Sequence, residues 1–235
     1  MRRVVLVLAL ILTSCSAIPY VPASLVDRAS IISTAYHATG VLYDVDKTGK
    51  IDEMEADCTV WNVAKLVDGY EAVTAAHCIE TGTIYRAYYG DVTAGEIPKI
   101  SATVPVRVIA VGDKDTSNDI ALLDVKTTAV LPVLPLGPRP AMGDGVMAIG
   151  APFGAIVKGL YEGHVVYPSV KSHDTTLNGM IFVILPGDGP GGSGSAVFNE
   201  QGQVIGILTL YNPEGGSLLV PSAGIAALMK SNPTK

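Results

Sequence analysis

Short β-type segments separated by turn residues run through most of this 235-residue chain. They are rich in Val, Ile and Tyr, whereas Gly (25 residues) and Pro (15 residues) recur between them. Such residues favour strands and turns respectively. The first set of segments covers 37–45, 58–67, 69–77, 83–92, 104–113 and 119–126, and the second 145–154, 158–170, 179–187, 193–212 and 216–224. This pattern predicts an all-β fold of two packed barrels or a sandwich.

A Pro- and Gly-rich stretch without a hydrophobic period, residues 127–145, separates the two sets. We expect one domain over 31–235, long enough for a sizeable core. Its first half covers about 31–126 and its second about 146–221. The segment "SAGIAALMKS" (222–231) predicts a C-terminal helix with Ser222 as its N-cap.

Charge argues against one class of partner. Only 16% of the residues are charged and the net charge is −6. A nucleic-acid surface needs clustered Lys and Arg, and the chain has no basic run. We therefore expect no nucleic-acid partner.

The N-terminus has the features of an export signal. Met1-Arg2-Arg3 precedes the apolar run "VVLVLALIL", which is too short to span a bilayer. The next residues, "LTSC", resemble the lipobox of bacterial lipoproteins, which implies a signal peptide over 1–14, lipidation of Cys15 and a tether over 15–30. The protein would then be exported and anchored to a bacterial membrane by the lipid, facing the periplasm or the cell exterior. The alternative is an ordinary secretory signal that contains a cysteine.

Two cysteines remain if Cys15 carries lipid. In an oxidising compartment Cys58 and Cys78 would form a disulfide, worth roughly 3 kcal/mol for a loop of about 20 residues. Two buried free thiols are the alternative.

Three motifs carry the residues of a nucleophilic site. "VTAAHC" places His77 after an apolar strand, "SNDIALL" places Asp119 before another, and "GPGGSGSAV" places Ser193 in a glycine-rich turn before a third. Each motif alone is weak. Their order along the chain, His, Asp and then Ser, is that of the chymotrypsin class and differs from subtilisin and the α/β-hydrolases.

These motifs resemble those of trypsin/chymotrypsin-like serine peptidases. "TAAHC" and "NDIALL" match the family's histidine and aspartate motifs, and "GGSGS" corresponds to its Gly-Asp-Ser-Gly-Gly. Residues 131–207 are also similar to the protease domain of HtrA/Deg-type enzymes, and no PDZ module is expected after the last helix. The resemblance implies two packed six-stranded antiparallel β-barrels with a short C-terminal helix.

It also implies the role of each residue. Ser193 would attack the substrate carbonyl, His77 would transfer the proton, and Asp119 would orient the imidazole. The N–H groups of Gly191 and Ser193 would form the oxyanion hole. Ser195 is the rival nucleophile, but only Ser193 directly follows the two glycines.

The sequence departs from the trypsin pattern directly before Ser193. Trypsin-type zymogens have an Asp there that pairs with a newly freed N-terminus, whereas this chain has Gly192. Activation of that kind is therefore not expected, and the sequence leaves open what shapes the oxyanion loop.

The substrate pocket is placed by motif position alone. It would include Asp188, Thr209 and Tyr211. Asp188 would attract a basic side chain or else be a plain turn residue. The remaining lining is apolar and favours small or medium apolar residues.

The segment "DVDKTGKIDEME" fits a calcium-loop spacing, with Asp44, Asp46, Thr48, Lys50, Asp52 and Glu55 at the ligand positions. Its flanks predict strands rather than the two helices of an EF-hand. The alternative is an exposed hairpin loop, and no other cofactor is expected.

The sequence as a whole predicts a serine endopeptidase that cleaves polypeptides through an acyl-enzyme. Two alternatives stay open: an inactive protease-like binding module, which Gly192 would explain, and an esterase with the same triad.

Overall fold

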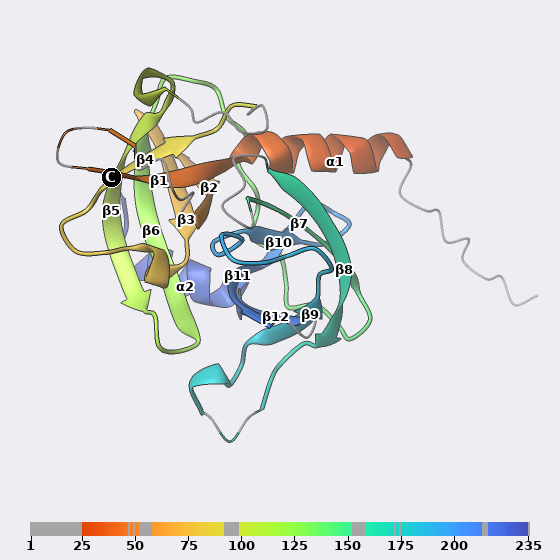
Figure 1. Ribbon diagram of the computed structural model, residues 1–235. Helices are drawn as coiled ribbons and strands as arrows, with labels where there is room; N and C mark the ends of the chain where they lie inside the picture. Colours follow the sequence, from red (N-terminus) through yellow and green to blue (C-terminus); the bar gives the residue numbers. More distant parts are fainter. Residues whose placement is uncertain are drawn as a thin grey trace, which may run out of the picture.

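The structure, a computed structural model, describes residues 25–46, 48, 50–51, 58–91, 99–151, 158–171, 173, 175–212 and 216–234. Cys15, Asp52 and Glu55 lie outside these ranges. Figure 1 shows two bodies of strands side by side. The first contains β1 (Thr39–Val45), β2 (Cys58–Leu66), β3 (Gly69–Thr74), β4 (Ile84–Tyr88), β5 (Val104–Asp113) and β6 (Asn118–Lys126). The second contains β7 (Gly145–Gly150), β8 (Gly159–Tyr167), β9 (Ile181–Ile184), β10 (Ala196–Phe198), β11 (Val204–Asn212) and β12 (Gly216–Pro221).

Each set of six strands closes into a barrel. The first barrel has the strand order β1-β2-β3-β6-β5-β4 and the second has the order β10-β11-β12-β9-β8-β7. Read from its other end, the second order is β7-β8-β9-β12-β11-β10, which is the first order repeated for the second six strands. Strands pair antiparallel around both barrels. The prediction of two six-stranded antiparallel barrels is therefore confirmed, and the sandwich alternative is wrong.

Strand β6 shows why the barrels pack together. Its residues from Asp119 to Val125 are all buried. Leu123 and Val125 point into the first barrel, whereas Ile120 and Leu122 join a core that also contains Phe198 of the second barrel. Successive side chains of a strand alternate between its two faces, so a strand that is apolar on both faces must be covered on both. The covering element on the outer face is the second barrel.

Within the described ranges, two α-helices and three short 3-10 helices accompany the strands. They are α1 (Leu25–Ala38), α2 (Ser222–Ser231), η1 (Ala76–Cys78), η2 (Ile100–Ala102) and η4 (Thr175–Leu177). The C-terminal helix lies over the predicted residues. Ser222 is not its N-cap, however, because the helix begins at Ser222 and Pro221 is the N-cap. The Ser222 hydroxyl donates instead to the carbonyl of Gly137 at 2.7 Å. None of the helices in the described ranges has the length and apolar character needed to cross a bilayer.

Helix α1 was not predicted from the sequence. Residues 25–30 were expected in the tether and residues 37–38 in the first strand, and both expectations are wrong. Ala35 and Ala38 are buried in the core between the barrels, and Arg28 pairs with Glu162 of β8. Lys158 Nζ donates to the carbonyls of Tyr36 and Thr39, both at 2.8 Å, at the end of the helix. Tertiary contacts of this kind stabilise short helices beyond their intrinsic propensity.

Candidate active site

His77 is held by two contacts from one carboxylate. It lies in η1, directly after the buried strand β3. Its backbone N–H donates to Asp119 Oδ1 at 2.9 Å, and its ring Nδ1 lies 2.7 Å from Asp119 Oδ2. The Asp119 side chain is 4% exposed and that of His77 is 33% exposed. Asp119 therefore fixes both the main chain and the ring of His77, and it leaves Nε2 as the nitrogen available to a substrate.

Ser193 lies in a loop whose backbone requires glycine. Gly191 has a φ of 89° and Gly194 a φ of 87°, values that residues with a Cβ rarely adopt. The loop is fastened on both sides. Thr59 N donates to Ser193 O at 2.8 Å, and Gly194 N donates to Leu208 O at 2.8 Å. The position of Ser193 is thus set by β2 of the first barrel and by β11 of the second.

The start of β2 also connects Ser193 with His77. Thr59 follows Cys58, which forms a disulfide with Cys78, the residue after His77. The two sulfur atoms and a ring nitrogen of His77 lie within 4.8 Å of one another. The predicted disulfide is therefore confirmed. Because both cysteines are oxidised in it, they do not offer the thiolates that a metal ion would need here.

Only one of the two serines in the motif is accessible. Ser195 is 2% exposed, and its Oγ would lie 1.9 Å from a Cβ placed on Gly150 of β7. Its backbone N–H donates to Gly192 O at 3.0 Å and its carbonyl accepts from Leu208 N at 3.0 Å. Ser195 is thus a packing residue between the loop and β7. Ser193 is partly exposed.

The N–H groups expected to form the oxyanion hole come from the same loop. Within the described part of the chain, the N–H groups of Gly191 and Ser193 take part in no backbone hydrogen bond, whereas those of Gly192 and Gly194 do. Thr59 Oγ1 lies 3.4 Å from Gly191 O and donates to it. This pattern leaves the two N–H groups available for a ligand.

The three predicted substrate residues lie in different surroundings. Asp188 is 5% exposed, and its Oδ2 accepts from Ser217 Oγ at 2.8 Å. Burial raises the pKa of this carboxyl, and the Ser217 hydroxyl opposes the rise. Thr209 is also buried, and its hydroxyl lies 3.5 Å from Leu218 O. Tyr211 is 38% exposed.

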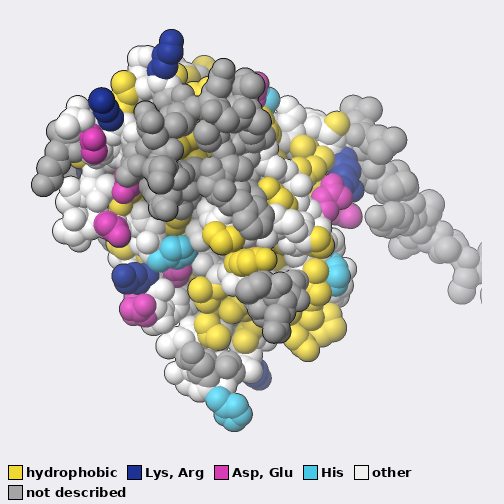
Figure 2. Space-filling view, viewed as in Figure 1, with side chains coloured by type: hydrophobic (Ala, Val, Ile, Leu, Met, Phe, Trp, Pro, Cys, Tyr) yellow, Lys and Arg dark blue, Asp and Glu magenta, His cyan; other side chains and the backbone are white. Residues whose placement is uncertain are grey.

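Tyr211 belongs to an apolar groove on the second barrel. Figure 2 shows hydrophobic side chains gathered on this part of the surface. Leu210 is 46% exposed and Tyr167, which stacks on Phe182, is 54% exposed. The groove is lined by Tyr167, Val170, Phe182, Leu210, Tyr211 and Leu218. Its residue Leu210 follows on β11 two positions after Leu208, whose backbone holds the Ser193 loop.

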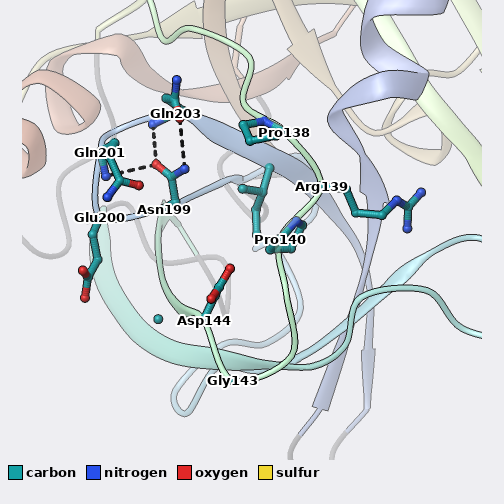
Figure 3. A pocket seen from close by; sticks show the side chains of 11 residues that line it. Pro138, Arg139, Pro140, Gly143, Asp144, Asn199, Glu200, Gln201 and Gln203 are labelled. Carbon is teal, nitrogen blue, oxygen red and sulfur yellow. Dashed lines mark hydrogen bonds between the residues drawn. The ribbon is translucent and has the colours of Figure 1, made fainter. Parts of the chain in front are cut away.

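A second hollow on this barrel is polar (Figure 3). It lies around the turn between β10 and β11. Asn199 Oδ1 accepts from the backbone N–H groups of Gln201 and Gln203, both at 3.0 Å, so the amide closes the turn. Arg139 borders the hollow and donates to the carbonyls of Pro168 and Gly179. None of the predicted site residues lines it.

The predicted calcium loop is described only in part. Asp46 Oδ1 accepts from Thr48 N at 2.8 Å, Thr48 Oγ1 at 2.7 Å and Lys50 N at 2.9 Å. These contacts close a turn after β1, to which Asp44 belongs. Because Asp52 and Glu55 lie outside the described residues, calcium binding stays a prediction.

Sequence reasoning missed the residues that hold the site together. Thr59 and Ser217 contact the Ser193 loop from strands far away in sequence. Thr74 Oγ1 donates to Thr59 O at 2.8 Å and so helps to hold Thr59, which contacts the Ser193 loop. Thr74 belongs to the "TAAHC" motif, but the motif gave it no role of its own. Thr59 had only its position beside the predicted disulfide as a local signal, and Ser217 belongs to no motif.

Comparison with known proteins agrees with this arrangement. A search of curated proteins finds no match. The family profile of the trypsin-like peptidase domain matches residues 56–207, more than half of the chain. The matched segment contains His77, Asp119 and Ser193. The chain therefore belongs to the trypsin-like peptidase domain family.

Proposed function

We propose that the protein is a serine endopeptidase that hydrolyses polypeptides through His77, Asp119 and Ser193. The observation that carries the proposal is the double contact of Asp119 with His77, at 2.9 Å and 2.7 Å. A surface histidine without a catalytic role has no need of a buried carboxylate that fixes both its main chain and its ring. Similarity to the HtrA/Deg type is the finer family assignment that we propose.

The reaction follows from these positions. Ser193 Oγ attacks the carbonyl carbon, and its proton passes to His77 Nε2. Asp119 stabilises the imidazolium that results. The C–N bond then breaks, and His77 gives the proton to the leaving amine. Water attacks the acyl-enzyme in the same way, and the acid product and free Ser193 are restored.

Stabilisation of the developing oxyanion is assigned to the N–H groups of Gly191 and Ser193. Their lack of backbone partners among the described residues supports this role. The loss of one such donor typically costs about 3–4 kcal/mol of transition-state stabilisation.

Substrate recognition is assigned to the second barrel. The exposed apolar groove beside Tyr211 would take an apolar side chain from the acyl half of the substrate. Thr209 lies on β11 between Leu208, which contacts the Ser193 loop, and Leu210 of this groove. Asp188 stays the predicted contact for a basic side chain.

Labelling with a fluorophosphonate probe tests the proposed chemistry. The probe reacts with an activated serine, so wild-type protein should be labelled and Ser193→Ala should not. Ser195→Ala is the matched control, because that serine is packed against Gly150, and this variant should keep the label. Wild-type protein that stays unlabelled would refute the proposal and favour the inactive binding module.

The same preparation distinguishes a peptidase from an esterase. We expect the wild type to cleave casein and Ser193→Ala to leave it intact. Turnover of ester substrates alone would support the esterase alternative.

We also propose that the protein is exported and anchored through lipid on Cys15. The lipobox-like "LTSC" and the Cys58–Cys78 disulfide support this location, because disulfides persist in oxidising compartments. Cys15→Ser should move the protein from the membrane fraction to the soluble fraction of a bacterial host. An unchanged distribution, or no incorporation of labelled fatty acid into the wild type, would count against the anchor.

A further inference from the structure

A buried carboxylate occupies the space beside the residue that precedes Ser193. A Cβ placed on Gly192 would lie 2.4 Å from Asp188 Oδ1. The next contact of that Cβ would be Gly189 O at 3.0 Å, which is tight. A separation of 2.4 Å is essentially never found for a real Cβ, so Gly192 has no room for a side chain while Asp188 keeps its place.

The backbone of Gly192 does not by itself require glycine. Gly191 and Gly194 both have a positive φ, but Gly192 does not. Its φ therefore gives no reason for a glycine at this position. The restriction that the structure shows is the space for a Cβ, which is taken above all by the Asp188 carboxylate.

Asp188 is fixed at both ends. Its backbone N–H donates to Leu185 O at 3.2 Å, and its Oδ2 accepts from Ser217 Oγ on β12 at 2.8 Å. The loop then folds back over it, since Gly192 N donates to Gly189 O at 2.9 Å. The carboxylate is thus clamped between β12 and the Gly192 end of the loop.

We propose that Asp188 is a positioning residue that holds the Gly191–Gly192–Ser193 backbone with its N–H groups directed at one oxyanion. It would give this backbone a carboxylate support although Gly192 itself carries no acid. This role rests on the proposed peptidase function. It differs from the predicted contact with a basic substrate side chain, because it acts on every substrate.

The contact between Asp188 and Gly192 depends on the shape of the Asp188 side chain and on its hydrogen bond with Ser217. An asparagine has nearly the same shape as aspartate, and its amide oxygen can accept from the Ser217 hydroxyl. Alanine would leave a void beside Gly192 and release the loop. Asp188→Asn should therefore preserve most of the function, whereas Asp188→Ala should not.

The test compares four variants on two amide substrates, one with a basic and one with an apolar side chain before the scissile bond. We expect Asp188→Ala to lower kcat about 10- to 100-fold on both substrates, less than the loss of a whole oxyanion donor, with little change in KM. The rate of labelling by the fluorophosphonate should fall by a similar factor. The kcat and the labelling rate of Asp188→Asn should stay within about fivefold of the wild-type values.

Substitution of Gly192 gives a second, independent readout of its contact with Asp188. Gly192→Ala alone should lose activity, because its Cβ collides with the carboxylate. The double variant Asp188→Ala/Gly192→Ala should be more active than Gly192→Ala, because the new methyl group enters the vacated space. Such non-additivity is expected of residues in contact and not of distant, independent ones.

Three results would overturn the proposal. The first is an effect of Asp188→Ala that is confined to KM for the basic substrate, which would make Asp188 a substrate contact. The second is an unchanged kcat in Asp188→Ala. The third is strictly additive effects in the double variant. Melting temperatures show whether each variant is folded, and rates are compared per folded molecule. Labelling of wild-type Ser193 is established first, so that failure of the peptidase function and failure of this inference give different results.

Discussion

Asp119→Asn is expected to lower kcat about 10⁴-fold while the protein stays folded. In the wild type, the two oxygens of Asp119 accept from the main-chain N–H and from ring Nδ1 of His77. An asparagine offers one oxygen and one NH₂ group. If the oxygen keeps the main-chain contact, the NH₂ group faces Nδ1 and selects the tautomer that carries its proton on Nε2. His77 can then no longer accept the proton of Ser193.

A second buried aspartate on the same strand provides the control. Asp124 is 1% exposed and pairs with Arg107 at 2.7 Å and Lys126 at 3.2 Å. Asp124→Asn weakens these ion pairs and should lower stability, but kcat per folded molecule should stay near the wild type. The measurement is kcat on an amide substrate together with the thermal unfolding of each variant. An Asp119→Asn protein within tenfold of the wild type would show that His77 is not the base.

The barrels and the order of the site residues could be predicted because the relevant signals are local. Alternating apolar residues define strands such as β6, and glycines mark the turn before Ser193. His77 directly follows the apolar strand β3, and Asp119 lies at the start of the apolar strand β6. The two residues lie close together because β3 pairs with β6, where Thr74 lies opposite Ala121.

Other features depend on contacts that no local pattern contains. Helix α1 was missed because its stability comes from the burial of Ala35 and Ala38 and from Lys158, more than a hundred residues away. The reason for a glycine at position 192 could not be predicted from the sequence either. From sequence it is a departure from the trypsin pattern, whereas the structure shows the Asp188 carboxylate in the space that a side chain would need.

Gly194→Ala is expected to be the most destabilising small substitution near the site. The φ of 87° alone costs an L-residue about 1–2 kcal/mol. The new Cβ would also lie 2.1 Å from Thr59 O and 2.5 Å from Thr74 Oγ1. Because Thr59 O is backbone and accepts the Thr74 hydroxyl, neither atom can move without breaking a hydrogen bond. We expect a total loss of more than about 4 kcal/mol in the free energy of unfolding.

Gly82→Ala separates the backbone strain from the collision. Gly82 has the same φ, 88°, but a Cβ there would meet no atom within 4 Å. Its substitution should cost only the backbone strain, about 1–2 kcal/mol. Chemical denaturation of both variants gives the difference, and a Gly194→Ala protein no less stable than Gly82→Ala would refute the collision. Since Thr59 also donates to Ser193 O, the folded fraction of Gly194→Ala should react slowly with the fluorophosphonate, whereas Gly82→Ala should react at the wild-type rate. The close packing of Gly194 on β2 would then be a requirement of both the fold and the nucleophile.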